Sequence, residues 1–207
     1  QCWRTYYERM WMLVGMEELM VELHLHPERV GVLEHFLREY TLQLIERWGK
    51  AGVDAIYLAD DWGSQASTLI APSMWRKVFK AGYKQMFEKA HEYSMYTFFH
   101  SDGNIVPIIE DLIEIGLDVL NPLQSSAIDI EKAAGLFGGR ICFMGGLDVQ
   151  HMLTEGTPVE IRQYVTRTVG ILGSFDGGYI ICPDNTLMPE TPIENINALL
   201  ESGIKYG

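Results

Sequence analysis

The chain has 207 residues, of which 47% are hydrophobic and 21% charged, and its formal net charge at pH 7 is −12. This composition is typical of a folded domain that is large enough to bury a sizeable core. The acidic balance disfavours nucleic acid as a partner, because nucleic-acid-binding proteins present basic surfaces, and no apolar run reaches the roughly 18 residues that would predict a membrane span.

The first 50 residues are predicted to be helical. One helix is expected from Tyr7 to Leu23, followed by a break at His26 and Pro27. Pro27 then opens a second helix that runs to about Gly49, in which apolar residues recur at spacings of three and four.

Beyond residue 50, short apolar runs alternate with helical patterns. This alternation predicts a parallel sheet covered by helices. The strands are expected near residues 53–59, 95–100, 117–120, 140–145 and 178–182. The helices are expected near residues 73–92, 104–115, 129–137, 158–172 and 192–202.

Two of these helices share one start signal. The segments Thr157-Pro158-Val159-Glu160 and Thr191-Pro192-Ile193-Glu194 both place Thr before Pro and Glu at the third helical position. Thr can cap free amide groups, Pro suits the first helical position, and Glu closes a capping box. We therefore expect a capping box at both helix starts.

Each apolar run ends at a polar or ionisable cluster. The clusters are Asp60-Asp61, His100-Ser101-Asp102-Gly103, Asn121-Pro122-Leu123-Gln124, Gly145-Gly146-Leu147-Asp148 and Cys182-Pro183-Asp184-Asn185. Polar residues gathered after buried parallel strands predict an α/β fold of the (β/α) barrel type, with its active site at the carboxyl ends of the strands. We expect a single domain over residues 1–207.

Five strands cannot close an eight-stranded barrel, so an open doubly wound sheet is the alternative architecture. Such a sheet usually carries a glycine-rich phosphate loop after its first strand. The turn Asp60-Asp61-Trp62-Gly63 is not a loop of that kind.

His100, Asp102 and Cys182 form a candidate zinc site. His100 and Asp102 flank one residue at the end of a predicted strand, where alternate side chains point the same way. Cys182 ends the last strand, which lies beside the first in a closed barrel. Imidazole, carboxylate and thiolate are zinc donors, and three protein ligands with an open position are the catalytic arrangement.

A structural role for the same residues is the alternative. His100 would then only end a strand, Asp102 would cap the helix that is expected to start near Asn104, and Cys182 would be a small buried residue. The spacing leaves both interpretations open.

Asp60 and Asp61 are candidate catalytic residues together with His100. Because they are adjacent, one is expected to face the pocket and the other the loop or the next helix. Neighbouring carboxylates in a cleft can raise the pKa of one of them and provide an acid or base. A solvated turn before Trp62 is the alternative.

Five further residues are candidates for substrate binding. Gly145 and Gly146 leave backbone exposed for a ligand or permit a tight turn, and Asp148 would line the rim or cap a helix. Asn121 and Gln124 could donate hydrogen bonds to a polar substrate, although loop polarity explains them equally well.

The cysteine pattern bears on the compartment. Cys2, Cys142 and Cys182 are an odd and widely spaced set, which is not a disulfide framework. We expect a reducing compartment, hence the cytoplasm. The chain starts at Gln1 without a leader pattern, so we expect either processing or a missing N-terminal part.

From Gly15 to Glu201 the chain resembles the uroporphyrinogen decarboxylase (URO-D) superfamily. The matching stretches, in order, are 58–65 (LADDWGSQ), 98–104 (FFHSDGN), 116–122 (GLDVLNP), 145–148 (GGLD) and 188–195 (MPETPIEN). The resemblance implies a (β/α)₈ barrel of which this chain supplies the last five strands. Three N-terminal strands, and the arginine-rich segment that grips substrate carboxylates in true uroporphyrinogen decarboxylases, would lie outside this sequence.

The branch that looks closest is that of the cobalamin-dependent methyltransferases. Their zinc site typically uses a His-x-Cys pair and a later Cys, so the resemblance implies His100 and Cys182 as ligands, with Asp102 in place of the middle Cys. Carboxylate oxygen is a harder donor than sulfur and leaves zinc more electrophilic, so a nitrogen acceptor such as tetrahydrofolate is as plausible as coenzyme M. Alternatively, Asp60 or Asp61 takes the place of Asp102 at the metal.

The function predicted from residues and resemblance together is zinc-dependent methyl transfer. It would run between a methylated corrinoid, held by a partner protein, and a small thiol or tetrahydrofolate-type acceptor. One alternative is a decarboxylase-like lyase, which would need cationic groups in its pocket, and few Arg or Lys follow the predicted strands. Another is a non-catalytic protein that binds a tetrapyrrole or a methyl carrier.

Overall fold

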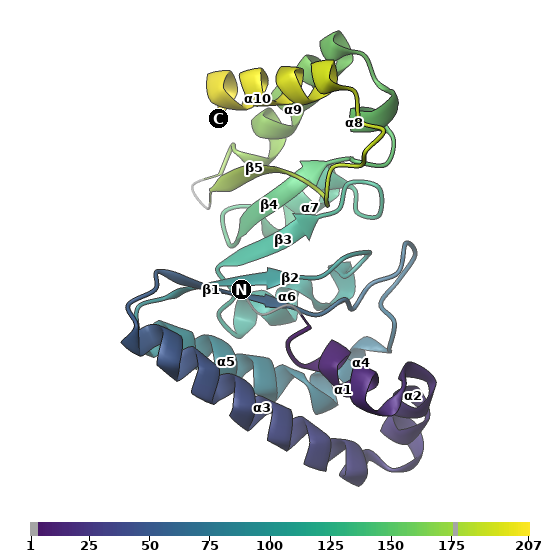
Figure 1. Cartoon of the computed structure of the whole chain (residues 1–207), viewed down its shortest axis with the longest axis vertical. Coiled ribbons are helices and arrows are strands. Elements are labelled where there is room, and N and C mark those ends of the chain that lie inside the picture. The colour runs from purple at the N-terminus through teal and green to yellow at the C-terminus, as the bar shows by residue number, and fades with distance from the viewer. Residues whose placement is uncertain (1–3, 176–177) are drawn as a thin grey trace.

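A computed structural model describes residues 4–175 and 178–207, and these form an α/β fold around a five-stranded sheet (Figure 1). The strands are β1 (Ala55–Ala59), β2 (Tyr96–His100), β3 (Val119–Leu123), β4 (Cys142–Leu147) and β5 (Tyr179–Pro183). The helices are α1 (Tyr7–Val14), α2 (Met16–Leu25), α3 (Pro27–Lys50), α4 (Pro72–Val78), α5 (Lys80–Glu92), α6 (Val106–Glu114), α7 (Ile130–Phe137), α8 (Met152–Glu155), α9 (Pro158–Leu172) and α10 (Ile193–Tyr206).

The sheet has the topology of a barrel segment. Its strands follow one another in sequence order, β1 to β5, and every neighbouring pair is parallel. A doubly wound sheet would reverse its strand order at a switch point, where ligands bind. The doubly wound alternative is therefore wrong, and the five βα units form part of a (β/α) barrel.

The strand register brings the site residues to one edge of the sheet. Ala59 pairs with His100, and His100 pairs with Asn121. The ladder continues for one more step, because Asp60 N–H donates to the carbonyl of His100 at 3.0 Å and Ser101 N–H to that of Asn121 at 2.8 Å. The loops after β1, β2 and β3 therefore start side by side.

The two faces of the sheet differ in burial. Leu58 and Phe99 point to the helix-covered face and are 0% exposed, whereas Tyr57 and Phe98, one residue along, are half-buried on the other face. Each fully buried Leu or Phe side chain contributes roughly 1.5–3 kcal/mol through burial. In Figure 1, α3 and α5 lie at the β1 end of the sheet and α9 and α10 at the β5 end.

Two of the predicted helices are broken in the structure. The helix expected from Tyr7 to Leu23 is divided into α1 and α2 at Gly15, whose φ of +92° is a backbone conformation that L side chains rarely adopt. The helix expected near residues 73–92 is divided into α4 and α5 at Phe79.

Only one of the two expected capping boxes forms. At Thr157 the side chain accepts from the N–H of Glu160, and the Glu160 carboxylate accepts from the N–H of Thr157. Helix α10 instead begins at Ile193 with Pro192 at its N-cap and no side-chain cap, and the hydroxyl of Thr191 is buried without a partner among the described residues. The box expected at Thr191 was therefore wrong.

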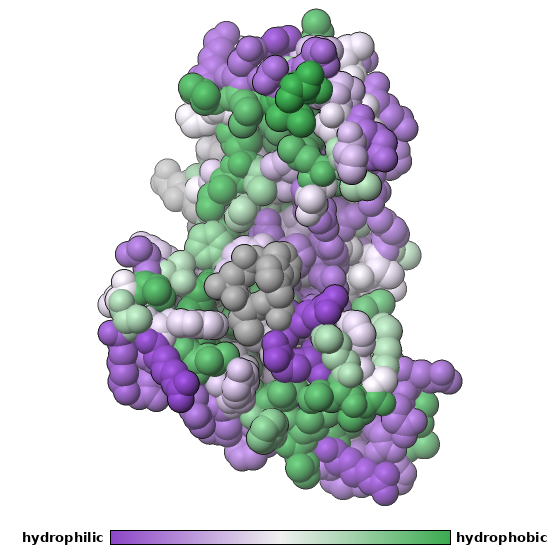
Figure 2. Space-filling model, in the orientation of Figure 1, coloured by the Kyte–Doolittle hydropathy of each residue, from purple (hydrophilic) through white to green (hydrophobic). Residues whose placement is uncertain are grey.

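Apolar side chains gather on the surface at the end of the molecule where α1 and α2 lie (Figure 2). Met12, Leu13, Met16 and Val21 are among the exposed ones. Within the described ranges, the helices lack the combination of length and apolar character that crossing a membrane requires.

Candidate functional site

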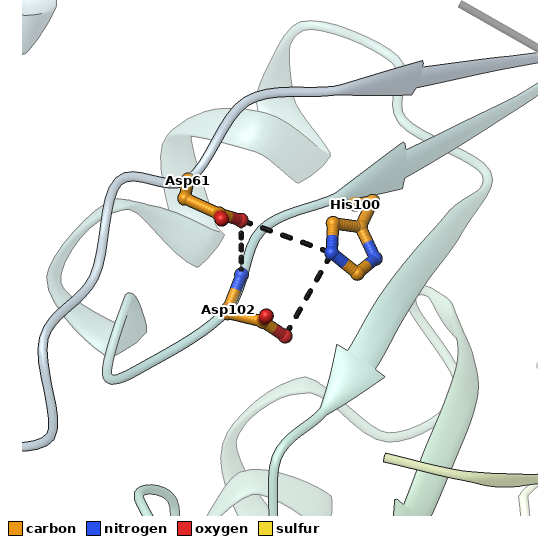
Figure 3. A group of neighbouring side chains, drawn as sticks. All are labelled: Asp61, His100 and Asp102. Carbon is orange, nitrogen blue, oxygen red and sulfur yellow. Dashed lines mark hydrogen bonds and ion pairs between the residues drawn. The ribbon is translucent and has the colours of Figure 1, made fainter. Parts of the chain in front are cut away.

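The carboxyl ends of β1 and β2 bring three potential metal ligands together (Figure 3). Asp61 lies in the loop after β1, His100 is the last residue of β2, and Asp102 follows in the next loop. One donor atom of each residue lies within 4.8 Å of the other two. Nε2 of His100 is 3.7 Å from Oδ1 of Asp61 and 3.7 Å from Oδ1 of Asp102. We call these three residues the donor group.

Hydrogen bonds between the two loops hold the donor group in place. Asp102 N–H donates to Oδ1 of Asp61 at 2.9 Å, and Trp62 N–H donates to Oγ of Ser101 at 2.9 Å. At Gly63 a Cβ atom would lie 2.5 Å from the carbonyl oxygen of Asp102. Only glycine therefore lets these loops approach closely enough for the two carboxylates to converge on His100.

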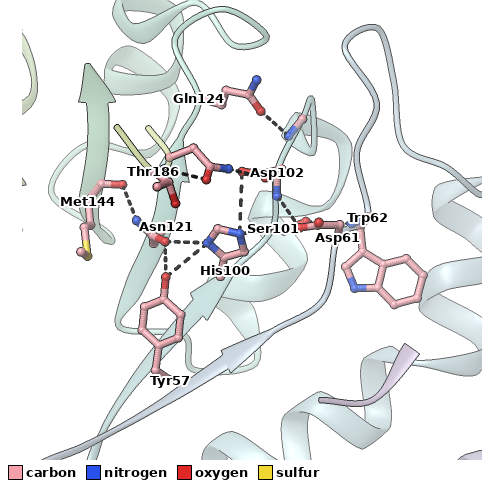
Figure 4. A network of polar contacts seen from close by, with 12 residues as sticks. Tyr57, Asp61, Trp62, His100, Ser101, Asp102, Asn121, Gln124, Met144 and Thr186 are labelled. Carbon is pink, nitrogen blue, oxygen red and sulfur yellow. Dashed lines mark hydrogen bonds and ion pairs between the residues drawn. The ribbon is translucent and has the colours of Figure 1, made fainter. Parts of the chain in front are cut away.

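A hydrogen-bond chain fixes the orientation of His100 (Figure 4). Nδ1 of His100 lies 2.7 Å from Oδ1 of Asn121, and the hydroxyl of Tyr57 donates to the same oxygen. Nδ2 of Asn121 faces the carbonyl of Met144 at 3.5 Å. Because Oδ1 of Asn121 can only accept, the network assigns a proton to Nδ1 of His100. In the neutral ring, Nε2 then directs its lone pair at the two carboxylates.

Asp102 is only partly satisfied by the protein. Nδ2 of Asn185 donates to its Oδ2 at 2.8 Å, whereas Oδ1 is buried without a hydrogen-bond partner among the residues that the structure describes. Burial raises the pKa of Asp102; His100 opposes this shift, and the charge of Asp61 adds to it. The orphaned Oδ1 is the atom that faces Nε2 of His100.

These features fit a divalent cation. Two carboxylates and a neutral imidazole carry a charge of −2, which a dication cancels. Carboxylate and imidazole bind zinc at about 2.0–2.2 Å, so neighbouring ligands of a tetrahedral ion lie roughly 3.4 Å apart, close to the 3.7 Å measured here. A cation at this point would satisfy the orphaned oxygen of Asp102.

Asp60 points away from the donor group. Its side chain is 0% exposed and accepts from the N–H groups of Tyr6 at 3.1 Å and Glu8 at 2.8 Å, and from the hydroxyl of Tyr83 at 2.7 Å. Burial raises the pKa of Asp60 to about 7, against the lowering effect of these hydrogen bonds. Asp60 thus anchors the N-terminal segment, and of the two adjacent carboxylates Asp61 is the one that faces the site.

Cys182 is not part of the donor group. The sequence predicted Cys182 as the third ligand beside His100 and Asp102, and in the donor group Asp61 takes that place. It lies in β5 beside Gly146 of β4 and is half-buried. Burial raises the pKa of Tyr57 to about 12, and the charges of Cys182, Asp102 and Asp61 add to that shift. Burial also raises the pKa of Cys182, which disfavours its thiolate form.

Two hollows meet at the donor group. The wide hollow, of about 790 Å³, is lined by Arg4, Glu8, Arg9, Met12, Leu13, Asp61, His100, Asp102 and Asn185. The narrow hollow, of about 270 Å³, is lined by Gly63, Ser64, Gln65, Asp102, Gly103, Gln124, Ser126, Asp148, Val149, Gln150, Asp184 and Asn185. Asp102 and Asn185 therefore stand between the two.

The predicted substrate-binding residues occupy different places. Gln124 and Asp148 line the narrow hollow. Gln124 also accepts from the N–H of Gly103 at 2.7 Å, which links the loops after β2 and β3. Asn121 lies behind His100 and orients it instead of lining either hollow.

Gly145 and Gly146 line neither hollow among the described residues. Their φ angles are +124° and +80°, and a Cβ on Gly145 would lie 2.9 Å from the backbone nitrogen of Leu123. Their carbonyls accept hydrogen bonds from the hydroxyls of Tyr179 at 2.6 Å and Tyr164 at 2.9 Å. These contacts favour the tight-turn interpretation of the two glycines.

Several residues that line the site were not predicted from the sequence. Asn185 belongs to the polar cluster after the last strand, so the strand-end pattern could have indicated it. Arg4, Glu8 and Arg9 come from the N-terminal segment, where no local pattern points to a site. The two arginines line the wide hollow without following a strand, so the expectation that few Arg or Lys follow the strands does not bear on them. Burial, and next the charge of Asp61, raise the pKa of Glu8.

A partial (β/α) barrel with a carboxylate–imidazole group at the carboxyl ends of its strands is the arrangement in which barrel enzymes carry their active sites. The chain belongs to the uroporphyrinogen decarboxylase (URO-D) family, whose profile matches residues 9–206.

Relatives of this chain include both decarboxylases and a methyltransferase. The uroporphyrinogen decarboxylase of Coxiella burnetii is 27% identical over 188 residues, covering 87% of this chain and 48% of its own length. The methylcobamide:CoM methyltransferase MtaA of Methanosarcina barkeri is 24% identical over 157 residues, covering 76% of this chain and 43% of its own. The chain thus spans about half the length of these relatives.

A solved structure of a methyltransferase from Methanosarcina mazei has the same fold. It superposes with a TM-score of 0.76 over 93% of this chain and 54% of its own, at 20% sequence identity. This likeness supports the assignment of the five βα units to a URO-D-type barrel.

Proposed function

We propose that this chain carries the active site of a zinc-dependent methyltransferase. The methyl donor would be a methylated corrinoid held by a partner protein, and the acceptor a small thiol or a tetrahydrofolate-type amine. The observation that carries the proposal is the convergence of Asp61, His100 and Asp102 at the strand ends. Similarity to a methylcobamide:CoM methyltransferase supports the reaction class.

Asp61, His100 and Asp102 would hold the zinc ion. Asn121 fixes the ring of His100 through Nδ1, and Asn185 fixes one oxygen of Asp102, so that the atoms facing the ion are Nε2 and Oδ1. When bound, zinc would lower the pKa of an acceptor thiol and orient it. The hard donor set makes a bound thiolate less nucleophilic than a sulfur-rich set would, which keeps the nitrogen acceptor in consideration.

The transfer itself is a displacement at the methyl carbon. The acceptor sulfur or nitrogen forms a bond to that carbon and gives up its proton, while the electron pair of the broken cobalt–carbon bond stays with cobalt. Glu8 lines the wide hollow with a raised pKa, so its carboxylate is suited to take the proton. The wide hollow is the larger entrance to the donor group and is where the methyl donor would approach.

Two measurements on the purified chain test the proposal. Metal analysis should find one zinc ion per chain, and His100→Ala should abolish it. Zinc-loaded protein should then demethylate free methylcobalamin in the presence of thiols, which the corrinoid spectrum follows. A folded chain without zinc, or one with zinc that leaves methylcobalamin unchanged, would overturn the proposal. Binding of methylcobalamin without demethylation would favour a carrier protein instead.

A decarboxylase-like lyase is the second candidate. The observation that favours it is the pair Arg4 and Arg9 in the wide hollow, because guanidinium groups bind carboxylates. Release of carbon dioxide from uroporphyrinogen by metal-free chain, with activity lost in Arg4→Ala and Arg9→Ala, would establish the lyase and exclude the methyltransferase.

A further inference from the structure

The narrow hollow has a one-sided charge. Of the described residues that line it, Asp102, Asp148 and Asp184 are acidic and none is Lys or Arg. The carboxylate of Asp148 already has partners, because its oxygens accept from the N–H groups of Gln150 and His151 and pair with the ring of His151. Asp102 accepts from Asn185 through one oxygen and faces the donor group with the other, so Asp184 is the carboxylate of this hollow with unfilled acceptor capacity.

Asp184 is the buried member of this set. It is 4% exposed, and its Oδ2 accepts from the N–H of Ser125 at 2.9 Å and from the Ser125 hydroxyl at 2.8 Å. Its Oδ1 is buried and has no hydrogen-bond partner of good geometry in the described part of the chain. Burial raises the pKa of Asp184 to about 6, against hydrogen bonds from Ser125 and from the backbone of Gly146 that lower it. A buried anion without a cation or a full set of donors is costly unless a ligand completes it.

Two amide side chains of the hollow are already engaged in hydrogen bonds within the protein. Gln124 uses its Oε1 to accept from Gly103 and its Nε2 to donate to Ser126 at 3.1 Å, and Asn185 donates to Asp102. Among the described residues, the charged side chains of the hollow are all carboxylates. The wide hollow differs, because Arg4 and Arg9 line it.

We infer that the narrow hollow binds an amino or ammonium group of the small acceptor and rejects an anionic tail. Its ligand donates a hydrogen bond to Asp184, while the reacting atom of the same molecule reaches the donor group beyond Asp102. The acceptor class is then an amine-bearing molecule and not a sulfonate thiol. This inference rests on the proposed function, because it specifies the acceptor of that reaction.

Three thiols that share the same two-carbon chain but differ in the charge of the end group test the inference. Cysteamine, mercaptoethanol and mercaptoethanesulfonate carry an ammonium, a hydroxyl and a sulfonate, and their affinities for zinc-loaded chain can be compared by calorimetry. We expect cysteamine to bind at least about tenfold tighter than mercaptoethanesulfonate, with mercaptoethanol between them. Equal or tighter binding of the sulfonate, or failure of all three to bind, would overturn the inference.

Two variants locate the preference in the hollow. Asp184→Asn should remove the advantage of cysteamine over mercaptoethanol. Should that variant fail to fold, Gln65→Lys offers a second test, because Gln65 is exposed at the hollow and a cation there should shift the preference toward the sulfonate. Gln43→Lys, an exposed position on α3, is the control for added charge elsewhere. An unchanged preference in Gln65→Lys would overturn the assignment to this hollow.

A metal-free measurement separates this inference from the proposed function. Ethanolamine and isethionate lack the thiol, and ligand-observed NMR can compare their binding to chain stripped of metal. A preference for ethanolamine would support amine binding in the narrow hollow even if the chain does not bind zinc. If the chain binds stoichiometric zinc but shows no preference for ethanolamine, the inference is wrong and the proposed function is unaffected.

Discussion

Nδ1 of His100 lies 2.7 Å from Oδ1 of Asn121, a side chain of the neighbouring strand in direct register with it. This contact decides which nitrogen of the ring faces Asp61 and Asp102. A carboxamide at this position can accept from Nδ1 only through its oxygen, and its nitrogen is turned toward β4. The orientation of a potential metal ligand is therefore set by the sheet and not by a mobile loop.

Replacing Asn121 should weaken metal binding without removing a ligand. In Asn121→Leu the ring of His100 loses its acceptor, and we expect zinc affinity to fall roughly 10–100-fold, as for other partners that orient metal ligands. Tyr57→Phe removes the donor to the same oxygen and a hydroxyl 3.2 Å from Nδ1, but it leaves the Asn121 acceptor in place, so it should cost less. Competition with a chelating dye measures both, and full affinity in Asn121→Leu would show that the contact does not orient the ring.

The composition of the donor group gives a second prediction. We expect Asp61→Asn to lose stoichiometric zinc and Cys182→Ser to keep it, because Asp61 and not Cys182 belongs to the group of atoms within 4.8 Å. Zinc content by elemental analysis, with melting curves to confirm folding, checks the pair. The opposite result would restore the ligand set that the sequence predicts.

The strand positions could be predicted because each strand is a short apolar run closed by polar residues. The break at Gly15 could not, since a helix pattern continues across it and only the positive φ ends the helix. The split at Phe79 has no local signal either. The α8 turn, Met152–Glu155, is too short to show a period.

Only the part of the site that follows from the alternation of side chains along one strand could be predicted from the sequence. His100 and Asp102 share a side because they are two residues apart at a strand end. Asp61 joins them only because Gly63 lets two loops pack closely, and Asn185 reaches Asp102 from the loop after β5. Such contacts join loops that are far apart in the chain, so no local spacing indicates them.

Asp60 should govern the pH dependence of stability and not catalysis. Its pKa is about 7 in the folded chain against 3.8 as the reference value, so between these values the folded state holds the proton and the unfolded state does not. Stability from this group is full below about pH 4 and is lost as the pH rises through 7. In metal-free protein, urea unfolding should show a larger loss between pH 4 and 7 for the wild type than for Asp60→Asn, in which Asp184 still contributes. An unchanged slope in the variant would contradict the assignment.

The two Thr-Pro helix starts offer a matched test of capping. Thr157 accepts from the N–H of Glu160, so Thr157→Ala should lower the free energy of unfolding by about 0.5–2 kcal/mol. Thr191 has the same sequence context but makes no cap, and its hydroxyl is buried without a partner in the described structure. Thr191→Val keeps the shape and removes only that unpaired group, so we expect a change within about 0.5 kcal/mol or a gain. Chemical denaturation of both variants measures the difference, and equal losses would mean that α10 is capped by Thr191 after all.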